Sequence, residues 1–328
     1  MIHSWYYKRG RAEVEQDVPT SRFSEVAGGI GGENGLLWID ILRPEIQELE
    51  SLEKCFGFHP LTIEDCVLNI SHPKLDHFDQ YLFLVVHAAR FERSGRDIKM
   101  GTVELDIFLG RNYVVTVHAE PVKSIVSMEE KCLKNPQVMG RGSDMFVVEL
   151  LDTLVENYMP PINALSEAIE VLEDEVLTNP TRMTLERIFT LQKDVIHLSR
   201  TLMPQGEIIK LMARDTSDLI NKKNKIYFDD IYDHIYRFNS IISYLRDASG
   251  TLLDGYGMMV NTKIQEAVKV MTVIATIMLP PVIFSSLYGA NFKFLPFADW
   301  EHGFWGMLLL SVLMSAGMTI WFRKRGWY

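Results

Sequence analysis

Acidic side chains dominate the chemistry that this sequence can offer. Asp and Glu number 43 against 33 Lys and Arg, and the formal net charge is −10. Residues 264–328 hold five Lys and Arg against three Asp and Glu, a balance of +2, which leaves −12 for residues 1–263. Proteins that bind nucleic acid depend on basic residues that neutralise phosphates, so this charge argues against a nucleic-acid partner. This negative charge favours a protein that interacts with cations.

Histidine and cysteine, the usual zinc ligands, are scattered along the chain. Their spacing matches no zinc motif, and the residues concerned are His72, His77, His87, His118, Cys55 and Cys66. Three cysteines without a CxxC pair favour a reducing compartment over a disulfide framework. The sequence also lacks a nucleophile elbow, an HExxH pattern and a P-loop, so we expect no enzymatic activity.

Two uncharged segments near the C-terminus predict membrane helices. Val270–Tyr288 and Phe304–Phe322 each contain 19 residues without a charge, close to the ~20 residues that cross a bilayer. A buried core helix is the alternative, but two such runs with a short connection favour spanning. We therefore predict a transmembrane domain over residues 268–328, with helices at about 268–288 and 304–322 and an outer loop at 289–303.

Charged residues beside these segments predict their orientation. Basic flanks stay in the cytoplasm, and here they are Lys263, Lys269, Arg323, Lys324 and Arg325. Both termini should therefore be cytoplasmic. Two helices cannot enclose a water-filled path, so any polar path needs several subunits. A membrane-anchored sensor or scaffold, whose helices only hold it in place, is a separate interpretation.

A long helix should lead into the first membrane segment. No proline occurs from Gln205 to Leu279, and an unbroken helix of ~75 residues would measure roughly 110 Å. Its residues follow a heptad pattern typical of a coiled coil, with the seam at Phe228, Ile231, Ile235, Phe238, Ile242, Leu245, Ser249, Leu252, Tyr256 and Met259.

The preceding residues divide into two predicted domains. Residues 1–140 form a cytoplasmic α/β domain, because a helical stretch at Glu45–Phe56 lies among β-rich segments. Those segments are Leu36–Ile39, Tyr81–Phe91, Thr102–Leu109 and Tyr113–His118, and they predict an antiparallel or mixed sheet. Residues 141–267 form a helical domain with supporting helices at Asp144–Leu177 and Thr184–Leu202 and the long stalk helix. The predicted fold class is α+β.

A recognisable motif, YGANF (residues 288–292), follows the first membrane segment. With other segments it resembles the CorA magnesium transporter family over nearly the whole chain. The supporting segments are WIDILRPEIQELESLEKCFGFHPLTIEDC (38–66), HPKLDHFDQYLFLVV (72–86), VLEDEVLTNP (171–180), KIYFDDIYDH (225–234) and KVMTVIATIMLPP (269–281). The family's usual Gly-Met-Asn is here Gly289-Ala290-Asn291. The resemblance implies a homopentamer with a funnel-shaped cytoplasmic domain, in contact with membrane lipid.

The same resemblance predicts an ion path. Gly289 and Asn291 would form the selectivity filter, since a neutral amide oxygen can hold a hydrated Mg²⁺ without trapping it. A simple helix C-cap is the alternative role for Asn291. The predicted pore-lining and gate positions are Gln265, Met271, Leu279, Val282 and Ser286. For Leu279 and Met271 the alternative is packing against the second membrane helix.

The resemblance also predicts how transport is regulated and which ion is transported. Asp230 matches the family's regulatory acidic position, Asp229 and Asp233 add charge nearby, and Glu92 is a partner from a neighbouring subunit. Cytoplasmic Mg²⁺ bound there would hold the pore closed. The predicted function is Mg²⁺ uptake across the plasma (inner) membrane. Because Ala290 replaces methionine, transport of Zn²⁺, Co²⁺ or Ni²⁺ on the same scaffold is the alternative.

Overall fold

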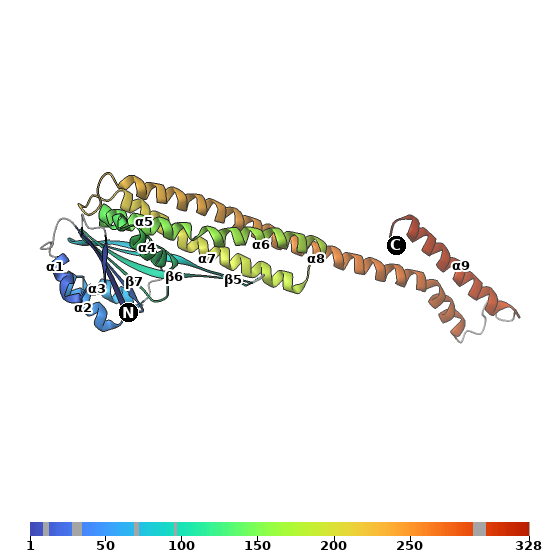
Figure 1. Ribbon diagram of the computed structural model, residues 1–328. Helices are drawn as coiled ribbons and strands as arrows, with labels where there is room; N and C mark the ends of the chain where they lie inside the picture. Colours follow the sequence, from blue (N-terminus) through green and yellow to red (C-terminus); the bar gives the residue numbers. More distant parts are fainter. Residues whose placement is uncertain (9–12, 28–34, 69–71, 95–96, 291–299, 328) are drawn as a thin grey trace. The chain divides into compact units, whose positions relative to one another are not determined.

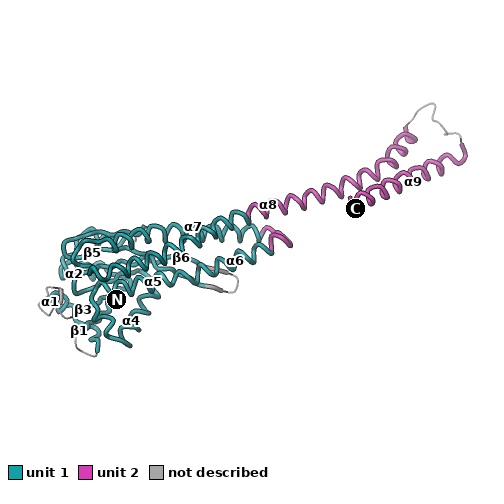
Figure 2. The backbone as a smooth tube through the Cα atoms, turned by 90° about the horizontal axis from the view of Figure 1, so that it is seen from above, with its two compact units in different colours: residues 1–174, 183–252 teal, residues 175–182, 253–328 magenta. Residues whose placement is uncertain are grey.

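The structure is a computed structural model that describes residues 1–8, 13–27, 35–68, 72–94, 97–290 and 300–327 (Figure 1). These residues fall into two compact units (Figure 2). The first unit comprises Met1–Asp174 and Met183–Leu252, and the second comprises Glu175–Arg182 and Leu253–Tyr328. Residues of the predicted helical domain occur in both units, and the division into three domains stays a prediction.

A seven-stranded mixed sheet forms the base of the first unit. Its strands follow the order β2-β1-β3-β7-β6-β5-β4, with β1 Ile2–Lys8, β2 Val14–Gln16, β3 Gly35–Leu42, β4 Lys74–His77, β5 Tyr81–Ser94, β6 Asp97–Gly110 and β7 Tyr113–His118. Only the pair of β3 and β7 is parallel among the described strand pairs; the others are antiparallel. The mixed sheet agrees with the prediction, and the β-rich segments mark its central strands.

Helices cover both faces of this sheet (Figure 1). One face packs against η1 Thr20–Arg22, α1 Phe23–Ala27, α2 Ile46–Phe56 and α3 Pro60–Leu68. There the fully buried Leu37 and Ile39 join Leu49 of α2 in a single apolar cluster. Successive strand residues point to opposite faces, so Trp38 points the other way and its ring lies 5.1 Å from that of Phe146 in α5 Ser143–Glu156.

The remaining helices range from 6 to 65 residues in length. They are α4 Lys123–Lys134, η2 Pro136–Arg141, α6 Met159–Thr178, α7 Arg182–Ala213, α8 Lys225–Gly289 and α9 Gly303–Lys324. Pro160 and Pro161 fall in the first turn of α6, where the missing N–H groups would have no helical partner in any case. The proline pair thus separates α5 from α6.

The expectation of an unbroken helix from Gln205 to Leu279 was wrong. Gln205 lies in α7, which ends at Ala213, and α8 begins only at Lys225. Side chains in residues 214–224 bind nearby backbone N–H groups: Asp215 Oδ1 accepts from Ser217 N, and Asn221 Oδ1 accepts from Lys223 N at 3.0 Å. Such local bonds compete with the helix, so a segment without proline can still end one.

The heptad seam of α8 is filled by the same chain within the first unit. Phe228, Ile235 and Ser249 are buried, and Gly206 of α7 lies so close that an added Cβ would be 2.9 Å from Cγ2 of Ile235. Further along, Gln192 Nε2 of α7 donates to the Ser249 carbonyl at 3.1 Å. The burial of the seam ends at Leu252; Tyr256 and Met259 are half-buried.

Candidate functional site

The second unit contains two helices long and apolar enough to cross a membrane, α8 and α9. Only 11% and 6% of the residues in their most apolar 18-residue stretches are buried. The core helix of a soluble protein would have most of these residues buried. Trp300, Trp305, Trp321 and Trp327 are all exposed near the ends of α9. Indole rings at such positions favour the interface between hydrocarbon and water.

Within this unit one face of α8 packs against α9. Val273 is 3% exposed, and Ser315 Oγ of α9 donates to the Ile277 carbonyl at 2.8 Å. One turn earlier, Lys269 Nζ donates to the Gly326 carbonyl at 2.9 Å and lies 6.0 Å from the ring centre of Trp327. Residues 269, 273 and 277 thus mark the contact face.

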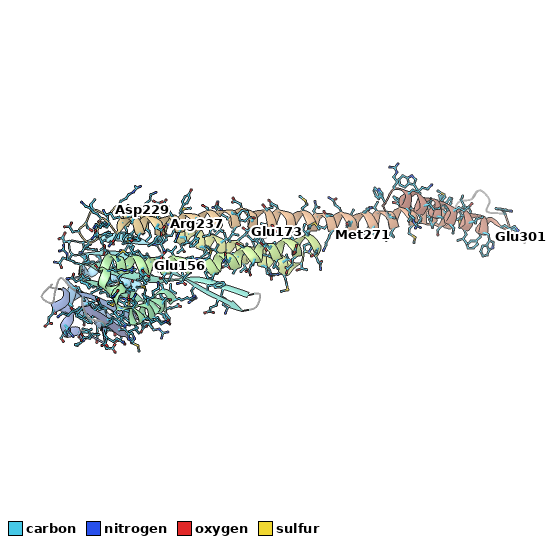
Figure 3. All side chains as sticks on the ribbon, turned by 45° about the horizontal axis from the view of Figure 1, so that its top comes forward. Glu156, Glu173, Asp229, Arg237, Met271 and Glu301 are labelled. Atoms are coloured by element: carbon cyan, nitrogen blue, oxygen red, sulfur yellow. The ribbon has the colours of Figure 1, made fainter. Side chains whose placement is uncertain are left out.

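The predicted pore positions lie on the other side of α8. Met271, Leu279 and Val282 are 72%, 53% and 56% exposed, and Gln265 and Ser286 are exposed as well. At 3.6 residues per turn, residues 271, 279, 282 and 286 point away from the face that holds Val273. The alternative role for Leu279 and Met271, packing against α9, is therefore not what the structure shows (Figure 3 labels Met271). Their role in a pore stays a prediction.

The predicted filter is only partly within the described residues. Gly289 is the last residue of α8, it is exposed, and an added Cβ would meet nothing within 4 Å. The Ala290 N–H donates to the Leu287 carbonyl at 3.4 Å, which closes the last turn. Asn291 lies outside the described residues, so its role stays a prediction.

The predicted regulatory carboxylates lie on the surface of the first unit. Asp229, Asp230 and Asp233 are exposed on the first turns of α8, and Glu92 is exposed on β5. Among the described residues, no three His, Cys, Asp or Glu side chains are placed to hold a metal ion within one chain. Figure 3 labels Asp229 and, on α5, Glu156.

The structure adds acidic residues from α5 that the sequence did not suggest. Burial raises the pKa of Asp152, and the negative charges of Glu156, Glu149 and Asp230 raise it further, while the positive charge of His234 lowers it. His234 Nδ1 lies 3.8 Å from Asp152 Oδ1. Negative charge is therefore concentrated where α5 meets the start of α8. Sequence analysis missed it because nothing in the pattern predicts that these helices are neighbours.

Two of the scattered histidines, His77 and His118, contact carboxylate and carbonyl oxygens of the same chain. His77 Nε2 lies 2.8 Å from Asp215 Oδ2. His118 Nε2 lies 3.1 Å from Asp40 Oδ1, while its Nδ1 lies 2.6 Å from the Glu120 carbonyl. These contacts give His77 and His118 hydrogen-bond partners within the described residues.

Comparison with known proteins places this geometry in a family. A family model described as "CorA-like Mg2+ transporter protein" matches residues 33–324. The protein YfjQ of Bacillus subtilis is 31% identical over 291 residues, with 89% of each chain covered. The cobalt/magnesium transport protein CorA of Thermotoga maritima is 30% identical over 295 residues, with 88% of this chain and 83% of that protein covered.

Solved structures support the same fold. The CorA magnesium transporter from Methanocaldococcus jannaschii superposes with a TM-score of 0.82 at 22% identity, with 99% of this chain and 98% of that chain covered. The N-terminal α/β domain, the long helix and the two C-terminal apolar helices are therefore shared along the whole length. This chain belongs to the CorA-like Mg²⁺ transporter family.

Proposed function

We propose that this chain is one subunit of a homopentameric channel that admits Mg²⁺ into the cell. The observation that carries the proposal is the face of α8 that bears Met271, Leu279 and Val282. This face is exposed and points away from α9, although it lies within the stretch that is apolar enough to span a membrane. One face of α8 contacts α9 and the opposite face is exposed. The exposed faces of α8 from several copies can therefore line one common pore.

Oligomerisation follows from the helix count. Two helices per chain cannot enclose water, so the α8 helices of several copies must surround one axis. The family membership suggests five copies. In such a ring α9 lies outside α8, where its exposed Leu309, Leu313 and Ile320 contact membrane lipid. The exposed tryptophans at the ends of α9 then lie at the interfacial depth that indole rings prefer.

Selection of Mg²⁺ is assigned to the end of α8. Mg²⁺ gives up its water reluctantly, so a ring of neutral oxygens can recognise the hydrated ion. Gly289 leaves the backbone carbonyl accessible, because no side chain stands beside it. Asn291 of each copy would add an amide oxygen. Met271 and Leu279 would form apolar rings that close the path by dewetting.

Control by cytoplasmic Mg²⁺ is assigned to the acidic start of α8. Asp229, Asp230 and Asp233 are exposed, so they are available to a neighbouring copy, where Glu92 is the proposed partner. Bound Mg²⁺ would neutralise these charges and hold the closed state. When Mg²⁺ leaves, like charges at the interfaces repel and the ring opens.

The location and direction follow from charge. Basic flanks around the two helices favour cytoplasmic termini, and the proposed location is the plasma (inner) membrane. A negative-inside potential is worth ~2.3 kcal/mol per elementary charge per 100 mV, so a dication flows inward. Transport of this kind needs no chemical step, and we propose no enzymatic activity.

A transition metal is the second candidate substrate. Ala290 stands where the family usually has methionine, and the Thermotoga maritima relative is named as a transporter of cobalt as well as magnesium. Uptake of Mg²⁺, Zn²⁺, Co²⁺ and Ni²⁺ into matched proteoliposomes distinguishes the two. Preference for Mg²⁺ supports the first proposal, whereas uptake of the other ions alone would replace it. A protein that takes up none of them would be the anchored sensor instead.

Disulfide cross-linking tests the pore face directly. In a background without the native cysteines, Met271→Cys should form disulfide-linked dimers, because residues 271 of adjacent copies face one axis. Val273→Cys is the matched control, since Val273 is covered by α9. Equal or greater cross-linking at Val273 would contradict the assignment, and native mass spectrometry gives the number of copies.

A further inference from the structure

A cavity lined by several cationic side chains lies in the first unit. It has a volume of about 600 Å³, and it opens between the start of α5 and the α7–α8 connection, residues 214–224. Four cationic side chains line it: Arg111, Arg141, Lys222 and Lys225. A chain of net charge −10 thus gathers four positive charges around one hollow.

The two acidic residues of the same cavity, Asp144 and Asp218, compensate for half of this charge. Asp144 is 7% exposed, and its two oxygens accept from Met145 N at 2.9 Å, Asn221 N at 2.9 Å and Asn224 Nδ2 at 2.8 Å. Asp218 is the other acidic lining residue. Within the part of the chain that the structure describes, the side chains of Arg111, Arg141 and Lys222 have no ion-pair partner. The lining therefore carries a formal balance of +2.

A second cavity of about 690 Å³ adjoins the first. The two share Arg111 and residues 217–219 as lining residues, so the two cavities lie next to each other at Arg111. The second cavity is lined by three aromatic rings, those of Phe56, Phe78 and Tyr113. Phe78 is only partly buried and stacks on Tyr81 with the ring centres 4.7 Å apart. Phe56 and Tyr113 are 4% and 5% exposed, so Phe78 is the aromatic side chain of this cavity that a ligand can reach.

The residues around the hollow are held in place by buried contacts. Asp215, which is 5% exposed, binds His77 Nε2 at 2.8 Å, and its carbonyl accepts from Lys225 Nζ. Gly142 has a φ of +111°, a conformation that only glycine adopts readily; it turns the chain between Arg141 and α5. Such support pre-organises a site before any ligand arrives.

From this arrangement we propose that these two adjacent cavities together bind a nucleoside phosphate. Arginine side chains bind phosphate oxygens with two parallel hydrogen bonds, and Arg111, Arg141, Lys222 and Lys225 provide the matching charge. The base lies in the adjoining aromatic cavity, against Phe78. Ligand sites usually measure 300–1,000 Å³ and combine apolar walls with a few polar groups, and each of the two cavities falls in this range.

Calorimetric titration of ATP into the detergent-purified full-length protein tests the proposal. EDTA is present throughout, so that binding of a divalent cation does not contribute to the heat. We expect saturable binding of one ATP per chain. Arg111→Ala and Arg141→Ala should each weaken it about tenfold or more, as expected for the loss of a charge-assisted bond. Arg246→Ala is the matched control, because Arg246 is exposed on α8 and lines neither cavity; ATP affinity should not change.

Titration of pyrophosphate, which has no base, tests the cationic cavity separately from the aromatic cavity. Phe78→Ala should weaken ATP binding and leave pyrophosphate binding unchanged. Pyrophosphate that binds wild type as tightly as ATP would overturn the assignment of a nucleoside. Absence of saturable ATP binding, or equal weakening by Arg246→Ala, would overturn the site itself. Thermal melting of each variant shows that it is folded, and none of these results depends on ion transport.

Discussion

At the scale of single residues, the most unusual side chain is Asp106 in the sheet. It is 3% exposed, and its Oδ1 has no hydrogen-bond partner among the described residues. Burial raises its pKa to about 8, and the negative charge of Glu104 adds to the effect. Glu104 and Asp106 alternate with apolar residues along β6, a pattern that normally indicates a solvent-exposed face. The sequence could therefore not predict that helices cover this face.

We expect Asp106→Asn to make the protein less sensitive to pH. The folded state keeps the proton up to about pH 8, whereas the unfolded state loses it near pH 4. The wild-type free energy of unfolding therefore falls as the pH rises between these values. Above pH 8 the variant should be more stable by about 1–3 kcal/mol, because asparagine stays neutral whereas the buried Asp106 carboxylate is ionised near Glu104.

Thermal melting of the purified protein between pH 5 and 8.5 measures this effect. Glu64→Gln is the control, because Glu64 is exposed on the neighbouring α3. A wild-type melting temperature that does not fall relative to Asp106→Asn as the pH rises would contradict the raised pKa.

At the scale of elements, α8 presents different faces to different neighbours. Its heptad seam packs on α7 in the first unit, and residues 269, 273 and 277 contact α9 in the second. The seam and the apolar run were both predictable, because periodicity and length are local signals. The start of α8 was not: Asp215, Ser217 and Asn221 are turn-forming residues, but their effect depends partly on Asp144, which is far away in the sequence.

The close approach of α7 and α8 predicts opposite effects at two glycines. Gly206→Ala should destabilise the protein by about 1–3 kcal/mol, because its Cβ would lie 2.9 Å from Cγ2 of the fully buried Ile235. Gly250→Ala meets nothing within 4 Å, and it should stabilise the helix by about 0.5–1 kcal/mol. Melting temperatures of the two variants check this pair, and a Gly206→Ala protein as stable as wild type would refute the contact.

If Leu279 forms a ring of apolar side chains in the proposed pore, a polar side chain at this position should let Mg²⁺ leak through the closed channel. Leu279→Asn should let water enter the closed path, so Mg²⁺ should enter vesicles even when their internal Mg²⁺ is high. Val273→Asn is the control: it faces α9, so it should lower the melting temperature and leave closure intact. Stopped-flow uptake with a fluorescent Mg²⁺ indicator measures both, and tight closure in Leu279→Asn would argue against a gate at this position.

At the scale of the whole molecule, the proposed transporter combines a sensing unit with a membrane unit. Family and architecture could be recognised from sequence, since the motifs occur along most of the chain. The number of copies and the ligands between copies could not, because they depend on surfaces of different chains. Among the described residues Asp230 and Glu92 belong to no group of three that could hold a metal ion, so the proposed site between copies needs residues from a second chain.

Asp230→Ala should weaken feedback by internal Mg²⁺. If Mg²⁺ between subunits holds the channel closed, removal of this carboxylate should leave uptake active at internal Mg²⁺ concentrations that stop the wild type. Asp254→Ala, an exposed acidic residue further along α8, is the control and should keep the wild-type response. Full inhibition of Asp230→Ala under these conditions would show that Asp230 does not sense Mg²⁺.

The filter proposed at the end of α8 should be essential for Mg²⁺ conduction by this chain. The most direct test is Mg²⁺ uptake into proteoliposomes with a negative-inside potential, in which wild type is compared with Asn291→Ala and with the control Asn261→Ala. Asn261 is exposed on α8 before its apolar stretch. We predict uptake by wild type and Asn261→Ala and none by Asn291→Ala. Folded, correctly oriented wild-type protein that takes up no Mg²⁺ would contradict the claim.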